Sequence, residues 1–247
     1  ELGPEDYNNY EFAPSRIILW VANQQHLYFG SFVLAVPIFC MLIEFIGIRV
    51  REEDPVMAEK YDRLAKDLMK VSLTAYSWTA ILGGILLFTF ITLFPGFFKY
   101  MAGIFRPVMH VYALMFLAES GVLYVYYYGW DKMKDDTFLK WIHCSLSVLL
   151  NLIGTVLMYL ANSWATFMQA PGGIDSEGRF LGNIWHVIHS TLWNPVGVHR
   201  ILGNIVFGGG IVGAYAAYHY LTAKNEEERA HYDWVCYVAM FICIFGL

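Results

Sequence analysis

The sequence contains 247 residues, of which 57% are hydrophobic and 15% are charged, and its mean hydropathy is +0.46. A soluble domain of this length does not need so much apolar sequence for its core, so the composition excludes an ordinary soluble protein. The formal net charge of −5 provides no basic stripe, which argues against a nucleic-acid partner. We therefore expect an integral membrane protein in contact with lipid.

The apolar residues form consecutive blocks of at least about 20 residues, which is long enough to cross a bilayer as a helix. Five complete blocks cover residues 17–48, 71–98, 107–130, 141–168 and 195–222. A sixth begins near Tyr232 and the printed sequence stops inside it, so we expect a longer protein. The predicted fold is an all-α integral membrane protein, a multi-helix transmembrane bundle of at least five to six spans that forms one domain over 1–247.

Most of the sixteen Lys and Arg residues lie in the connections 49–70, 131–140 and 223–231. The positive-inside rule predicts that these connections face the cytoplasm and that the N-terminus faces outward. Residues 51–70 carry mixed charges and are expected to form an amphipathic helix that continues into the second span. The outer connection, 169–194, begins with glycines and ends in a Trp- and His-rich segment that is expected to lie at the membrane interface.

The stretch VANQQHLYFG places Gln24, Gln25 and His26 inside the first apolar block, where an unpartnered polar group costs free energy. His26 follows Arg16 by ten residues, about 15 Å along a helix, which puts it in the outer half of the bilayer. Two interpretations stay open from spacing alone. The imidazole either hydrogen-bonds a neighbouring helix or ligates the iron of a haem held among the helices. At least one glutamine is expected to face the bundle.

Glu119 lies near the middle of the third block, thirteen residues after Arg106 and twelve before Asp131. An isolated carboxylate at that depth is expected to take up a proton, which is typical of a proton relay or a cofactor contact. The alternative is a protonated side chain that a helix neighbour satisfies. Glu44 lies five residues from Arg49, near the cytoplasmic surface, where it can snorkel or form an ion pair.

Other residues give weaker signals. His186 and His189 are three residues apart and suit zinc, although the sequence fixes no third ligand, and interfacial hydrogen bonding is the commoner role. The stretch GNIVFGGGIVGAYAAYHY, with Gly209 and Gly213 four apart, predicts a face that contacts either a neighbouring helix, the commoner case, or a flat macrocycle. The cysteines form no CxxCH pattern, so no covalently attached haem is expected.

The order of motifs resembles subunit I of the cytochrome bd oxidases, a superfamily of membrane oxygen reductases. Ser15 and Arg16, followed by a histidine ten residues later, and then LIEFIG resemble its first span. FLAES and YYYGWDKM resemble its third span and the turn after it, LLNLIG and LANSWATFMQAP its fourth span, and TLWNPVG the start of its fifth. The resemblance covers roughly residues 15 to 225 and indicates a divergent, bd-like member.

The resemblance implies roles for particular residues. His26 matches the first-span histidine that ligates a haem iron in the family. Glu119 matches the third-span Glu of the proton route, and with Ser120 and Asn151 as companions it forms the expected catalytic group. Arg16 matches an arginine placed to meet haem propionates. The implied cofactors are haem b and, as an open alternative, haem d in addition.

Two positions depart from the family pattern. The fifth-span histidine that ligates the family's low-spin haem falls on Gly203 here. His199, one turn earlier on the same face, is a candidate substitute, and the alternative is that this haem is absent. The acidic residue that the family places eight residues before the third-span Glu is Val111, with His110 adjacent. The quinol-binding loop and the family's further haem ligands would lie beyond residue 247.

Three functions stay open at this point, and the sequence does not decide whether the chain is a subunit of an enzyme. The first is a haem-bearing subunit of a terminal oxygen reductase, an oxidoreductase that passes electrons from quinol or an outer-side cytochrome c to dioxygen with protons relayed past Glu119. The second is a non-catalytic anchor or haem electron conduit in a larger respiratory complex. The third is a transporter with an intramembrane proton carboxylate. The resemblance further implies a second multi-helix membrane subunit and a bacterial-type inner membrane.

Overall fold

The computed structural model describes residues 7–9 and 11–246 of the chain. Its elements are α1 (Ser15–Val50), α2 (Pro55–Leu93), α3 (Pro95–Met133), α4 (Thr137–Gln169), α5 (Ile184–Ile188), α6 (Trp193–Thr222) and α7 (Glu226–Gly246). These described residues contain no β-strand, and Ile174 and Phe180 form an isolated antiparallel bridge. Five helices, α1 to α4 and α6, are long and apolar enough to cross a membrane. The predicted all-α transmembrane fold is confirmed.

The second helix joins two segments that differ in composition. α2 begins at Pro55, whose missing N–H is not needed in a first turn, and the Asp54 side chain accepts a hydrogen bond from the Met57 N–H at 2.9 Å. From there the helix runs to Leu93 without interruption. The connection predicted to be amphipathic is therefore helical from residue 55 and continuous with the second apolar block.

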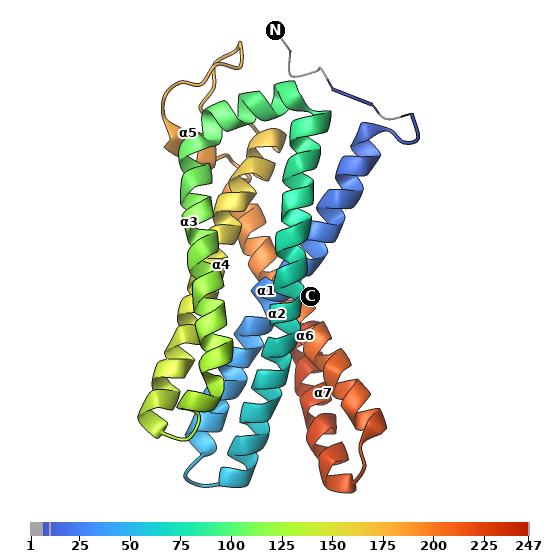
Figure 1. Ribbon diagram of the computed structural model, residues 1–247, viewed down its shortest axis with the longest axis vertical. Coiled ribbons are helices and arrows are strands. Elements are labelled where there is room, and N and C mark those ends of the chain that lie inside the picture. Colours follow the sequence, from blue (N-terminus) through green and yellow to red (C-terminus); the bar gives the residue numbers. More distant parts are fainter. Residues whose placement is uncertain (1–6, 10, 247) are drawn as a thin grey trace. The chain divides into compact units, whose positions relative to one another are not determined.

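A proline separates α2 from α3. Pro95 cannot donate a backbone hydrogen bond and disfavours a helical conformation at Phe94, so one helix ends at Leu93 and the next begins at residue 95. The apolar block that extends to residue 98 is thus divided between two helices. A second proline, Pro107, lies inside α3, and Figure 1 shows that this helix bends near its start.

The described residues form two compact units. The first unit contains residues up to 30, 75–118 and 156–198. The second unit contains residues 31–74, 119–155 and 199 onward. Helices α1 to α4 and α6 each contribute one part to the first unit and one part to the second, and each unit has its own set of buried side chains.

The core of the first unit gathers apolar side chains from α3, α4 and α5. Its buried members are Met101, Ile104, Phe105, Val108, Phe167, Val187 and Ile188. The connection 169–194 holds the short helix α5, whose N-cap residue Asn183 accepts a hydrogen bond from the Trp185 N–H. In the turn before α5, hydrogen bonds from the backbone N–H and then from the guanidinium of Arg179 hold the pKa of the Asp175 carboxyl below its usual value.

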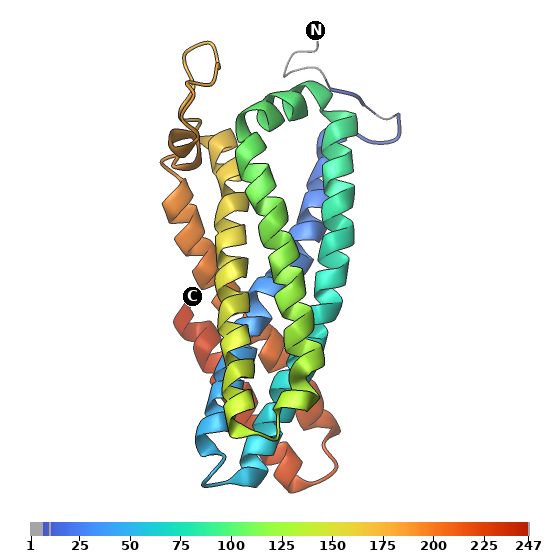
Figure 2. The ribbon, with the colours of Figure 1, turned by 60° about the vertical axis from the view of Figure 1, so that its left-hand side comes forward.

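In the second unit, α6 and α7 pack through glycines, and the helices lie side by side in both Figure 1 and Figure 2. A Cβ built at Gly209 would lie 2.9 Å from Cys243 Sγ, and one built at Gly213 would lie 3.5 Å from Ala239 Cβ. Small residues allow such close approach between membrane helices. At these two positions the predicted glycine face contacts a neighbouring helix.

Candidate functional site

His26, the first candidate, lies in the first unit against α2. Its Nδ1 lies 3.1 Å from the backbone carbonyl oxygen of Thr79, and because a carbonyl only accepts, this nitrogen carries the hydrogen. One turn along α2, a Cβ built at Gly83 would lie 3.0 Å from the ring atom Cε1 and 3.3 Å from Nδ1. The half-buried ring thus occupies a notch that exists because residue 83 has no side chain. A hydrogen bond at Nδ1 orients an imidazole and makes Nε2 the ligating nitrogen in metal sites.

The polar neighbours of His26 on α1 face outward from the first unit. Gln24 and Gln25 are both exposed, which differs from the expectation that at least one of them faces the bundle. Arg16, one residue into the helix, is also exposed, and no ion pair to its guanidinium is present in the described part of the chain. These side chains are therefore accessible to a cofactor or to a second subunit.

Glu119, the second candidate, is buried in the second unit. It is 5% exposed, and a Cβ built at Gly154 on α4 would lie 3.0 Å from its Oε1. Over residues 7–9 and 11–246, no hydrogen bond or ion pair to this carboxyl group is found. Asn151, three residues before Gly154, donates to the carbonyl oxygens of Ser147 at 2.8 Å and Pro37 at 3.2 Å. A buried carboxyl group without a protein partner is suited to holding a proton or meeting a bound group.

Glu44 is buried in the second unit and has partners from two other helices, α3 and α4. Its Oε2 accepts a hydrogen bond from the Tyr126 hydroxyl at 2.7 Å, and its Oε1 lies 2.8 Å from Lys140 Nζ and 2.5 Å from His143 Nδ1. Lys140 forms a second ion pair with Asp62. The expected ion pair of Glu44 therefore exists, but it lies within the protein and involves two residues of α4. The sequence offered one hint, since residues 140 and 143 are three apart and share a helix face.

Aromatic rings enclose this network. The Trp130 indole N–H donates to Asp62 at 2.9 Å, and its ring centroid lies 4.5 Å from Lys140 Nζ. The imidazole of His143 stacks on the Tyr126 ring with centroids 4.4 Å apart, and its Nε2 lies 2.8 Å from the Tyr126 carbonyl oxygen. Buried charges are tolerated only when they are paired and hydrogen-bonded. Because α1, α2, α3 and α4 each contribute residues to the network, it depends on the contacts among these four helices.

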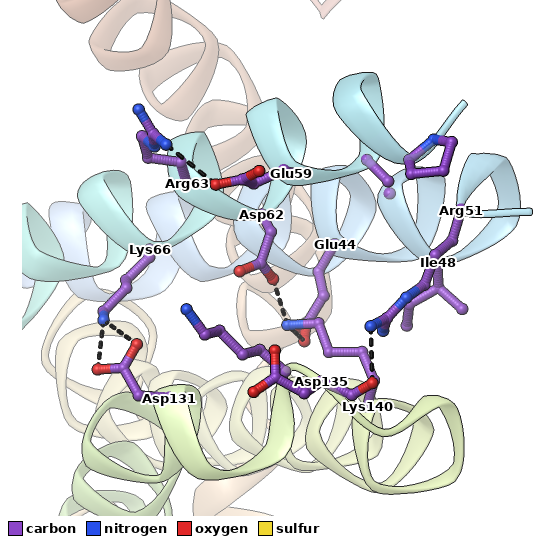
Figure 3. Close-up of a pocket in the computed structure, with 14 residues that line it drawn as sticks. Glu44, Ile48, Arg51, Glu59, Asp62, Arg63, Lys66, Asp131, Asp135 and Lys140 are labelled. Carbon is purple, nitrogen blue, oxygen red and sulfur yellow. Dashed lines mark hydrogen bonds and ion pairs between the residues drawn. The ribbon is translucent and has the colours of Figure 1, made fainter.

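A cavity of about 510 Å³ adjoins the network in the second unit. Figure 3 shows that side chains of both charge signs surround it. The charged residues lining it are Glu44, Arg51, Glu59, Asp62, Arg63, Lys66, Asp131, Lys134, Asp135 and Lys140. Many of these charges are already compensated, as in the pair between Lys66 and Asp131 at 2.7 Å. The cavity thus brings a polar surface up to the buried Glu44.

The other predicted residues lie on α3, in the connection 169–194 and on α6. His199 and Gly203 are exposed on α6, and no described atom lies within 4 Å of a Cβ built at Gly203. Ser120 is half-buried on α3. The Nδ1 of His189 contacts the Trp185 carbonyl oxygen at 2.9 Å, and the described residues contain no cluster of three His, Cys, Asp or Glu side chains that could hold a metal ion. The zinc interpretation therefore has no support in this part of the chain.

Comparison with known proteins gives one family and one fold. The model of the family described as cytochrome bd terminal oxidase subunit I matches residues 15–247. Among solved structures, the bd oxidase from Geobacillus thermodenitrificans matches with a TM-score of 0.80 and 16% sequence identity, over 94% of this chain and 51% of that chain. This chain therefore spans about half the length of that solved chain and shares its fold. No match is found among curated proteins.

Proposed function

Because this chain belongs to the cytochrome bd terminal oxidase subunit I family, we propose that it is the haem-binding membrane subunit of a terminal oxygen reductase. Its five membrane-spanning helices make it a multi-pass membrane protein, and the proposed location is a bacterial-type inner membrane. Electrons come from quinol or from an outer-side cytochrome c, and protons reach the reaction past Glu119. A second multi-helix membrane subunit completes the complex.

The observation that carries this proposal is the arrangement around His26. A carbonyl at Nδ1 and a glycine notch beneath the ring are the features that orient a ligating imidazole. In this proposal His26 would ligate the iron of a haem, haem b being the expected type with haem d as an additional alternative, and the exposed Arg16 on the same helix would bind its propionates. The bound haem supplies oxygen binding and electron transfer, while the protein sets the plane and tautomer of the imidazole.

Glu119 holds and passes protons in this proposal, with Ser120 and Asn151 as companions. Its carboxyl group is buried and has no partner among the described residues, so it is not committed to an ion pair. Asn151 lies on α4 three residues before Gly154, the position that faces Glu119, and its amide is held by two backbone carbonyls, which fixes the direction of its side-chain oxygen. A carboxyl group that can accept and release a proton at membrane depth suits a reaction that consumes protons.

The family's low-spin haem does not fit the residues at its fifth-span position. Gly203 has no side chain, and a Cβ built there meets no described atom within 4 Å. His199, exposed one turn earlier on α6, is the candidate that could ligate iron instead. We assign no step to this haem. Gly203 also favours a second candidate function, in which the chain is a non-catalytic anchor or haem conduit in a larger respiratory complex.

The two candidates are separated by the optical spectrum of the purified complex. Reduced-minus-oxidised and reduced-plus-CO spectra, with haem quantified as the pyridine haemochrome, are expected to show a CO-responsive high-spin haem. The His26→Ala variant is expected to assemble and to contain one haem fewer per complex. A spectrum with only CO-insensitive haem would support the conduit, and unchanged haem content in His26→Ala would remove the ligand assignment.

A further inference from the structure

The contacts of His143 fix the number of protons that it shares with Glu44. One ring nitrogen, Nε2, lies 2.8 Å from the Tyr126 carbonyl oxygen, which can only accept a hydrogen bond, so Nε2 carries a hydrogen. The other, Nδ1, lies 2.5 Å from Glu44 Oε1. A neutral imidazole with its hydrogen on Nε2 would place two lone pairs against each other if Glu44 were ionised. The contact is therefore attractive only when one proton lies on Nδ1 or on Oε1.

The charges around the pair require the same proton. Besides His143, the charged groups of the network are the buried Glu44 from α1, the half-buried Asp62 from α2 and the buried Lys140 from α4. Tyr126 and Trp130 from α3 and the thiols of Cys40 and Cys144 contribute no charge in their usual forms. With the shared proton the two carboxylates are balanced by two cations. Without it Lys140 alone would face two carboxylates, and one negative charge would remain uncompensated beside the fully buried imidazole, which is unfavourable.

The pair lies between the charged cavity and a line of polar side chains on α4. Glu44, Asp62 and Lys140 line the cavity, whereas His143 lies behind them and is fully buried. Ser147 and Asn151 follow His143 at intervals of one helical turn. The Ser147 hydroxyl donates to the Cys144 carbonyl oxygen at 2.6 Å. One turn rises about 5.4 Å, close to the length of two successive hydrogen bonds, so proton transfer along this line requires one water at each step.

The line of polar side chains on α4 leads toward Glu119, which lies on α3. A Cβ built at Gly154, three residues beyond Asn151, would lie 3.0 Å from Glu119 Oε1. On α1, Leu34 contacts the same point and Pro37 accepts a hydrogen bond from Asn151, so this helix runs along the line as well. From His143 to Gly154 the distance along α4 is about 16 Å. All of these residues belong to the second unit.

We propose that Glu44 and His143 form a proton-holding site that receives protons from the charged cavity and supplies Glu119 by way of Ser147 and Asn151. A proton arriving at Glu44 from the cavity leaves the pair as a carboxylic acid beside an imidazolium, and the pair returns to its neutral state when one of its protons is released on the Ser147 side. The number of protons in the site is the same before and after each transfer. This inference rests on the proposed function, because Glu119 is its destination.

The test compares variants of one network in the purified complex. Glu44→Gln and His143→Gln are expected to lower the rate of oxygen consumption at least about tenfold, since acid–base groups of this kind contribute factors of that size or more. Their haem spectra are expected to match the wild type. Glu44→Asp, which keeps a carboxyl group, is expected to recover most of the rate. Tyr126→Phe is the matched control, because it removes a hydrogen bond to the same carboxyl without removing the shared proton.

Two outcomes would overturn the proposal. One is full activity in Glu44→Gln and His143→Gln, and the other is an equal loss in Tyr126→Phe, which would indicate a purely structural network.

Infrared spectroscopy of the resting wild-type complex with ¹⁵N-labelled histidine gives a readout that needs no turnover and no variant. It is expected to show an imidazolium paired with a carboxylate or a neutral imidazole paired with a carboxylic acid. Absence of any such shared-proton signal refutes the site even if oxygen is reduced normally, whereas its presence without a CO-responsive haem refutes the proposed function alone.

Discussion

Replacing Gly83 by alanine is expected to weaken haem binding through His26, whereas the same change at the adjacent Gly84 is not. A Cβ at residue 83 would lie 3.0 Å from Cε1 of the imidazole, and ordinary contact begins at 3.4 Å, so the ring must move by at least about 0.4 Å. No described atom lies within 4 Å of a Cβ at residue 84. The two variants therefore add the same methyl group to the same helix and differ in whether it meets the ring.

The size of the effect follows from two opposing contributions. Exchanging glycine for alanine inside a helix stabilises it by about 0.5–1 kcal/mol, and both variants gain this amount. Overpacking costs about 1–3 kcal/mol, and only Gly83→Ala incurs it. If the ring must keep its position to ligate iron, the difference appears as a loss of haem affinity of about 5- to 150-fold, because 1.4 kcal/mol corresponds to a factor of ten.

Haem dissociation is measured by transfer of haem from the purified complex to an excess of an apo-globin acceptor. The electron paramagnetic resonance spectrum reports the orientation of the imidazole in the same samples. Gly83→Ala is expected to release one haem faster and to shift its signal, and Gly84→Ala is expected to match the wild type. Identical release rates and spectra in both variants would refute the argument that the notch positions a ligand.

Three further predictions concern separate sites. Gly154→Ala places a Cβ 3.0 Å from Glu119 Oε1 and is expected to slow oxygen consumption while haem content stays constant, as measured in parallel on one preparation. Gly203→His enters open space and is expected to leave thermal stability within about 1 kcal/mol while adding a six-coordinate low-spin haem signal. The hydrogen bonds of Arg179 lower the folded-state pKa of Asp175, so their stabilisation is present above the unfolded pKa of about 4 and is lost as the pH falls through the folded value. The protection factor for hydrogen exchange across residues 170–183, corrected for the intrinsic exchange rate at each pH, is therefore expected to fall in acid, and Asp175→Asn is expected to show the lower protection at neutral pH as well.

The membrane spans could be predicted because bilayer thickness sets the length of an apolar helix. The break between α2 and α3 was less evident, since apolar residues continue on both sides of Pro95 and only the backbone chemistry of proline divides them. The partition of the long helices into two compact units could not be predicted. It depends on which side chains meet between helices, and hydrophobic periodicity does not contain that information.

His26 and Glu119 could be singled out from the sequence as candidates because a polar side chain at membrane depth stands out against apolar neighbours. Glu44 could not be assigned in the same way, since Arg49, five residues away, offered a sufficient local partner. Its actual partners Tyr126 and His143 are 82 and 99 residues distant along the chain. A buried ion network of this kind depends on which helices pack together. The sequence shows that the ionisable residues are present, but it does not show that they contact one another.

Glycine illustrates how one sequence signal serves two purposes in a membrane helix. Gly209 faces another helix, as small residues in membrane proteins usually do, whereas Gly83 and Gly154 each face a polar side chain with a proposed function. The sequence shows only that the side chain is missing, and the atom opposite the missing Cβ distinguishes the two cases. Gly121, which has open space around it, is the matched control for Gly154. If alanine is tolerated at Gly83 and Gly154 as well as at their open counterparts, these glycines serve helix packing alone, and the assignments of His26 and Glu119 lose their geometric support.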